Sequence, residues 1–197
     1  EIGFERIITT GAKAQLYGNN LDKVNSIVIG GKTATDIAYT ENGENSYIEY
    51  TVPEGLADGT YRIILVDNGG NEYGGNKVTV TSDALITAGS ERTTANSEWV
   101  MTGINLNQIE SFTFGGQTVS SFIRQSETEI AFTCPSLEDG EYTLTGRTTS
   151  GKEVMFYTTA GNITEQTVVV SSERVLWEGH HYVSWDLPDD NPNKTFN

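Results

Sequence analysis

Apolar and polar residues alternate in short runs along most of the chain. Thr, Val, Ile, Tyr and Phe recur in these runs, and Gly, Asn, Asp and Ser interrupt them. No stretch of a dozen residues keeps the apolar spacing of a helix. The pattern predicts many short β-strands and negligible helix.

The pattern occurs twice along the chain. Residues 18–33 align without a gap with residues 103–118, and both segments begin Gly-x-Asn-Leu and end in Gly-Gly-x-Thr. Three further segments match: 48–53 with 130–135, 56–61 with 137–142, and 70–72 with 151–153. The distance along the chain between matching segments falls from 85 to 82 to 81 residues. The differences in length therefore lie between the matched strands, where loops tolerate them. Two copies of one domain are predicted in tandem.

Within each copy, the alternation predicts which side chains face the core. Gly-Gly and Asp-Gly pairs predict the turns, and a Pro closes the strand before the second turn. Short strands with such regular turns are typical of an antiparallel β-sandwich. The residues in core phase are Ile27, Ile29, Ile48, Tyr50, Val52, Tyr61, Ile63 and Leu65, and in the second copy Phe112, Phe114, Ile130, Phe132, Cys134, Tyr142 and Leu144.

The repeated residues resemble the immunoglobulin-like IPT/TIG family. The similar features are Gly-x-Asn-Leu, the strand ending in Gly-Gly, the strand ending in Pro, and Leu-x-Asp-Gly-x-Tyr, over about residues 5–80 and 84–160. The Cys and Trp landmarks of antibody domains are missing, so the resemblance implies only the looser architecture. The predicted fold class is all-β, with two tandem immunoglobulin-like β-sandwich domains, 1–82 and 83–166, plus the truncated start of a third β domain, 167–197.

The segment after the second copy differs from both copies. It reads Val-Leu-Trp-Glu-Gly from Val175 and reaches a second Trp at Trp185. It resembles the opening of the C-terminal domain of surface glycan-binding lipoproteins from gut Gram-negative bacteria. The resemblance implies a non-catalytic module at the cell surface, on the outer membrane and facing outward, that supports polysaccharide capture while the tandem domains act as a spacer.

Charge and composition narrow the possible partners. The chain carries 27 acidic and 12 Lys or Arg residues, a net charge of −15, which repels nucleic acid and anionic membrane surfaces. No membrane-spanning segment is predicted, and a chain that begins at Glu1 is expected to have lost a signal or lipid anchor. The single Cys excludes a disulfide scaffold.

No enzyme, cofactor or metal site is predicted. Cys134 takes the place of Val52 in the repeat, so it is expected to be a buried apolar residue rather than a nucleophile. Adjacent His180 and His181 would point to opposite faces of a strand and would not chelate one metal together. The Gly-rich stretch 68–75 is interpreted as a hairpin loop rather than a phosphate cradle, because no strand-to-helix context follows it.

Aromatic residues outside the core phase are the remaining signal. Flat aromatic faces suit sugar rings, whose hydroxyls bond to neighbouring polar groups. Packing between domains is the competing interpretation of a Trp at the start of a strand. The candidate carbohydrate-binding residues are Tyr47, Trp177, His180, His181, Tyr182 and Trp185.

Three functions remain open at this stage. The first is polysaccharide capture at the cell surface. The second is a structural or adhesive stalk that contacts a surface protein, which would need an exposed apolar patch. The third is a spacer from a larger enzyme.

Overall fold

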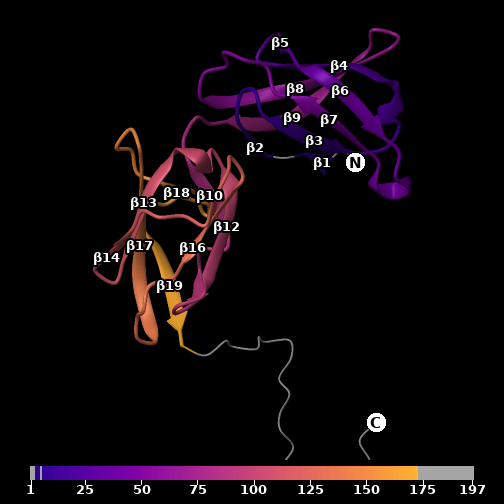
Figure 1. The fold of residues 1–197 in the computed structure, drawn as a ribbon. Helices are drawn as coiled ribbons and strands as arrows, with labels where there is room; N and C mark the ends of the chain where they lie inside the picture. Colours follow the sequence, from indigo (N-terminus) through magenta and orange to yellow (C-terminus); the bar gives the residue numbers. More distant parts are fainter. Residues whose placement is uncertain (1–2, 5, 173–197) are drawn as a thin grey trace, which may run out of the picture.

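The computed structural model describes residues 3–4 and 6–172, whose strands form two β-sandwiches (Figure 1). The first sandwich has a core that runs from Ile8 to Val80. The second has a separate core that runs from Ala84 to Val170. The predicted fold of two tandem immunoglobulin-like sandwiches is confirmed. Helix in the described residues is limited to three 3₁₀ turns, η1 (Leu21–Lys23), η2 (Gly43–Asn45) and η3 (Leu106–Gln108).

Nine strands build the first sandwich. They are β1 (Gly3–Phe4), β2 (Ile7–Ile8), β3 (Lys13–Tyr17), β4 (Val24–Ile29), β5 (Lys32–Thr33), β6 (Thr35–Thr40), β7 (Tyr47–Thr51), β8 (Gly59–Asp67) and β9 (Glu72–Val80). One sheet has the order β1-β3-β7-β6, and the other has the order β2-β9-β8-β4-β5. All pairs are antiparallel except β2 with β9.

Ten strands build the second sandwich. They are β10 (Leu85–Ala88), β11 (Arg92–Thr94), β12 (Glu98–Ile104), β13 (Ile109–Phe114), β14 (Gln117–Val119), β15 (Arg124–Gln125), β16 (Glu129–Thr133), β17 (Gly140–Thr148), β18 (Met155–Phe156) and β19 (Gln166–Ser171). The sheet orders are β15-β16-β12-β10-β18 and β11-β19-β17-β13-β14. Two short pairs, β10 with β18 and β11 with β19, are parallel.

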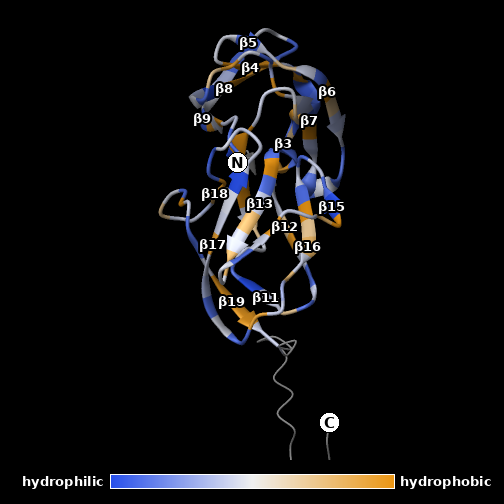
Figure 2. Ribbon diagram, turned by 60° about the vertical axis from the view of Figure 1, so that its left-hand side comes forward, coloured by the Kyte–Doolittle hydropathy of each residue, from blue (hydrophilic) through white to orange (hydrophobic). Residues whose placement is uncertain are grey.

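The predicted strand faces hold in both sandwiches, and Figure 2 shows strands that mix hydrophobic and hydrophilic residues along their length. Ile27, Phe112 and Cys134 are fully buried. The Gly-Gly turns also form as expected: Gly30 and Gly31 both have positive φ, which suits the tight hairpin between β4 and β5.

Tyr61 and Tyr142 keep the predicted core phase but are less buried than the other residues in it. They are only partly buried and pack against the edge of each core. Their hydroxyls donate hydrogen bonds to the carbonyl oxygens of Ala57 at 2.8 Å and Glu138 at 2.9 Å. These bonds hold each ring at the rim of its core, beside the turn that precedes the strand.

The expected boundary at residue 166 is too early. Strand β19 pairs with β17 and β11, and Val168 and Val170 are buried in the second core. Residues 167–171 therefore belong to the second sandwich rather than to the opening of a third domain. The rest of the predicted third domain, from residue 173, lies outside the described residues.

The junction between the sandwiches is polar. The Asn105 side-chain amide donates to the carbonyl oxygens of Thr81 at 3.3 Å and Asp83 at 3.0 Å. Gln108 Nε2 donates to the Ser82 carbonyl at 3.3 Å, and Lys152 Nζ lies 3.1 Å from the Asp83 carboxylate. Side chains from one end of the second sandwich thus hold the linker.

Candidate functional site

The candidate residues from the sequence fall in two places. Trp177, His180, His181, Tyr182 and Trp185 lie outside the described residues, so their role in sugar binding stays a prediction. Tyr47 lies on β7, between buried neighbours in alternate positions, and its side chain is on the outer face of the sheet.

Tyr47 pairs with a second tyrosine that the sequence reasoning missed. It lies directly opposite Tyr17 of β3, and their ring centroids are 5.8 Å apart with the planes tilted by 47°. Tyr17 is 41% exposed. Tyr17 follows buried Leu16 in the strand, so the alternation places its side chain on the outer face and could have identified it from the sequence.

Polar groups surround this tyrosine pair. The Tyr17 hydroxyl donates to Gln15 Oε1 at 2.7 Å, and Lys13 Nζ lies 2.7 Å from Glu49 Oε1. The bond from Lys13 is the first cause that lowers the pKa of Glu49, so this carboxylate is ionised near neutral pH. The outer face of the sheet thus combines aromatic surface with charged and amide groups.

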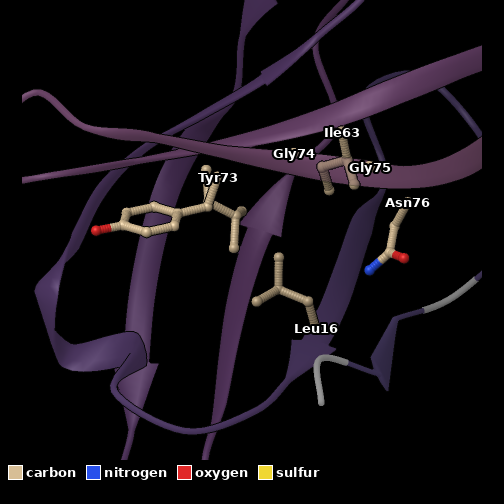
Figure 3. Close-up of a pocket in the computed structure, with 7 residues that line it drawn as sticks. Leu16, Ile63, Tyr73, Gly74, Gly75 and Asn76 are labelled. Atoms are coloured by element: carbon tan, nitrogen blue, oxygen red, sulfur yellow. The ribbon is translucent and has the colours of Figure 1, made fainter.

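The exposed Tyr73 lines two pockets in the first sandwich. The first is an apolar pocket of about 130 Å³ (Figure 3), where Tyr73 lies at one end, Asn76 at the other, and Leu16 between them. Gly74 and Gly75 leave this space open. At the matching positions in the second sandwich, Met155 and Phe156 form β18, and the Phe156 side chain is buried in the core.

The second pocket lies beside the same tyrosine, and several polar side chains line its largely apolar surface. Its volume is about 280 Å³. Its lining residues are Asn19, Asn20, Leu21, Lys23, Val24, Leu65, Asp67 and Tyr73, and we name it the amide pocket. A space of this size approaches the lower end of the range for small-molecule sites.

Asp67 fixes the position of Tyr73. Its Oδ2 accepts a hydrogen bond from the Tyr73 hydroxyl at 2.9 Å, and its Oδ1 accepts from the backbone N–H of Gly69 at 2.8 Å and of Asn71 at 2.9 Å. The Asn71 side chain donates to both oxygens. These donors, Asn71 first, lower the pKa of Asp67 to about 2. The carboxylate is ionised and its acceptor sites are filled, so it positions the ring and has no free site for a ligand.

The described residues offer no metal-binding cluster. No three His, Cys, Asp or Glu side chains in residues 3–4 and 6–172 gather closely enough to hold a metal ion. Burial raises the pKa of Cys134, which disfavours the thiolate that a nucleophile needs. In the same residues, no helix is long and apolar enough to cross a membrane.

Comparison with solved structures gives a strong match over the whole chain. It is SGBP-B of the mixed-linkage glucan utilization locus of Bacteroides ovatus, solved in complex with a mixed-linkage heptasaccharide. The two chains are 54% identical with a TM-score of 0.83. The match covers 100% of this chain and 50% of that chain, so this chain spans half the length of that protein.

Other surface glycan-binding proteins match more weakly. A surface glycan-binding protein from Prevotella bryantii is 14% identical over 76% of this chain and 37% of its own, with a TM-score of 0.32. SGBP-B from a xyloglucan utilization locus in Bacteroides uniformis is 18% identical over 87% of this chain and 47% of its own, with a TM-score of 0.36. No protein-family model and no curated protein matches the chain, and the IPT/TIG resemblance stays a prediction.

Proposed function

We propose that this chain is part of a non-catalytic glycan-binding protein at the cell surface. The supporting observation is its 54% identity, over its whole length, to SGBP-B of a mixed-linkage glucan utilization locus. The two sandwiches, as IPT/TIG-type modules, act as a spacer that holds a glycan-binding region away from an outer membrane to which a lipid anchor attaches the protein. The polar junction at residues 81–83 sets the direction of this spacer.

The proposed ligand is an uncharged polysaccharide, with mixed-linkage glucan as the first candidate. The heptasaccharide in the relative's structure suggests this glycan. The net charge of −15 supports a neutral ligand, because a polyanion such as a uronic-acid polymer would be repelled. Contacts to the sugar rings are assigned to Trp177, Tyr182 and Trp185, with His180 and His181 beside them.

Native affinity electrophoresis of the 197-residue chain tests the proposal. The gels contain mixed-linkage β-glucan, xyloglucan or the anionic polymer polygalacturonate. We expect mixed-linkage glucan to retard the chain and polygalacturonate to have no effect. Trp177→Ala and Trp185→Ala are expected to reduce retardation, and Tyr157→Ala, at an exposed tyrosine of the second sandwich, is the control.

The alternative is an adhesive stalk that contacts a surface protein. Two exposed apolar side chains of the second sandwich, Val100 and Ile123, favour it. Val100 lies opposite Ala131, and the Ala131 carbonyl accepts a hydrogen bond from the Ile123 backbone N–H. A chain that no polysaccharide retards would move the assignment to this alternative.

A further inference from the structure

Three loops meet at one end of the first sandwich, and we name this the distal loop end. They are residues 18–23, residues 41–46 and the β8–β9 hairpin, whose loop 68–71 is flanked by Asp67 and Tyr73. The linker to the second sandwich follows β9 at the opposite end (Figure 1). This end therefore lies away from the polar junction.

Two neighbouring pockets open at the distal loop end. The amide pocket ends at Tyr73, which is 53% exposed. The next pocket has a volume of about 480 Å³ and contains Tyr39, which is 40% exposed, together with Asp22, Glu41 and Ser46. Both pockets are lined by Asn19 and Asn20, so they form one row with an exposed tyrosine in each pocket.

The walls of these pockets are fixed before any ligand arrives. Asp67 closes the 67–73 hairpin and holds the Tyr73 ring. Ser46 Oγ accepts from the Asn42 backbone and donates to the Gly43 carbonyl, which pins the 41–46 loop. Fixed walls reduce the entropy that binding must overcome.

Polar side chains in the row are available for a ligand. The Asn20 side chain makes no capping bond. Within the described part of the chain, no hydrogen bond or ion pair engages the Asn19 amide or the Lys23 ammonium. Amide and ammonium groups beside a fixed aromatic ring are suited to bind sugar hydroxyls.

In the second sandwich, the loop end that corresponds to the distal loop end contacts the linker. Asn105 has φ 58° and ψ 29°, and its counterpart Asn20 has φ 58° and ψ 26°. Asn105 uses its side chain to hold the linker, whereas Asn20 lines the open row. Tyr73 also has no aromatic counterpart, because Val154 occupies that position and is buried. The exposed ring is therefore not required by the fold.

We infer that the distal loop end of the first sandwich is a second glycan-binding site, with Tyr73 and Tyr39 as sugar platforms and Asn19, Asn20 and Lys23 as hydroxyl partners. The inference rests on the proposed function and adds a site within the units assigned as a spacer. The ligand is a linear, uncharged glucan chain, because Asp22, Glu41 and Asp67 make the end acidic.

A protein ligand fits this end less well. The large apolar side chains exposed on the described first sandwich are all tyrosines, Tyr17, Tyr39 and Tyr73. A protein interface usually carries a contiguous apolar centre. Separate phenol rings among amides and carboxylates match the alternating apolar and hydroxyl surfaces of a glucan.

The test measures affinity for a mixed-linkage glucan heptasaccharide by isothermal titration calorimetry on the full 197-residue chain. Tyr73→Ala and Tyr39→Ala are each expected to weaken binding about two- to tenfold. Tyr73→Phe keeps the ring but loses the bond to Asp67, so it is expected to weaken binding less than Tyr73→Ala does. Asn20→Gly removes the amide and retains the positive φ, so it isolates the hydroxyl partner.

Tyr157→Ala, which removes an exposed tyrosine from the second sandwich, should leave the affinity unchanged. Unchanged melting temperatures separate lost contacts from lost fold. Amide NMR shifts on titrating the wild-type chain, concentrated in residues 18–23, 39–46 and 67–73, would support the site without any variant.

The outcomes separate this inference from the proposed function. Loss of affinity in Trp177→Ala or Trp185→Ala, with wild-type affinity in every distal-loop variant and no distal shifts, overturns the second site and keeps the function. Loss in both sets supports two sites on one chain. A wild-type chain that binds no glucan overturns the second site and favours the adhesive stalk.

Discussion

Replacement of Phe112 by Ala should destabilise the second sandwich and leave the first unchanged. Phe112 is fully buried, and its ring centroid lies 5.2 Å from that of Phe132 and 6.2 Å from that of Phe122. Truncation of a buried Phe to Ala costs about 3–5 kcal/mol, because the cavity only partly collapses. The neighbouring rings belong to one packed cluster, so we expect a value near 4 kcal/mol.

This loss should be visible as a large fall in melting temperature. For a domain of 60–100 residues, about 1 kcal/mol lowers the melting temperature by roughly 4–8 °C. The second sandwich should therefore melt about 15–30 °C lower in Phe112→Ala. The transition of the first sandwich should hardly move, because the two cores share no residue and the junction is made of a few polar contacts.

Tryptophan fluorescence can follow the second sandwich alone. The chain has three Trp residues, of which Trp99 is buried against Phe114 and Phe132. In a background with Trp177→Phe and Trp185→Phe, Trp99 reports only the second sandwich, while differential scanning calorimetry detects both transitions. Phe112→Leu, which retains most of the volume, should cost less than half as much as Phe112→Ala.

Two results would refute this reasoning. A shift of the Trp99 transition by less than about 4 °C would mean that the ring cluster contributes little packing energy. An equal shift of both calorimetric transitions would mean that the sandwiches unfold as one cooperative unit, contrary to their separate cores.

Three smaller predictions concern single residues. Cys134→Val should lower the free energy of unfolding, measured in urea, by less than about 1.5 kcal/mol. The native thiol should react with a thiol reagent far more slowly than the unfolded thiol, because burial raises the pKa of Cys134. Rapid labelling of the native protein would contradict this. Gly116→Ala should lower the free energy of unfolding by about 1–2 kcal/mol, because the φ of +72° at this position is unfavourable for alanine. No atom lies within 4 Å of the new methyl group, so steric crowding does not contribute. An unchanged urea midpoint would show that the turn tolerates the strain. The pKa of Asp67 is lowered to about 2, so its stabilisation should be complete above the ordinary value near 4 and disappear as the pH falls through 2; a carboxyl ¹³C titration midpoint near 4 would exclude the bonds to Asn71 and Tyr73.

The strand faces could be predicted because two signals agreed. Alternation assigned Ile27 to the core, and the repeat assigned Phe112 to the same position, so each copy checked the other. Both side chains are fully buried. A period of two residues and an internal repeat were sufficient for the sandwich fold.

The end of the second sandwich could not be predicted because the repeat lost register there. The insertion that contains Tyr157 and Glu165 separates β18 from β19, whereas β9 continues without interruption in the first copy. Strand β18 also moves to the opposite sheet and pairs with β10. This pairing joins residues that are far apart in sequence, and the alternation of apolar and polar residues within a strand does not predict which strand it pairs with.

The distal loop end was missed because its parts come from three loops. Tyr39, Tyr73 and Asn20 are separated in sequence, and each taken alone resembles an ordinary surface residue. The predicted hairpin loop 68–75 is shorter in the structure, because β9 begins at Glu72 and only residues 68–71 form the loop. The alternation says nothing about the pocket beside it. Pockets depend on how loops meet, which only the three-dimensional structure provides.

The two copies also separate the residues that the fold requires from those that are free to vary. Both copies place an Asn in the left-handed region before a 3₁₀ turn, so this backbone feature belongs to the fold. The side chains around it differ: Gln108 and Lys152 contact the linker in the second copy, whereas Lys23 lines an open pocket and Asn71 bonds to Asp67 in the first. One loop scaffold thus serves attachment at the junction and, at the distal end, presents polar and aromatic groups to solvent. Because different residues carry these two roles, the direction of the spacer and the proposed affinity for glucan can change independently.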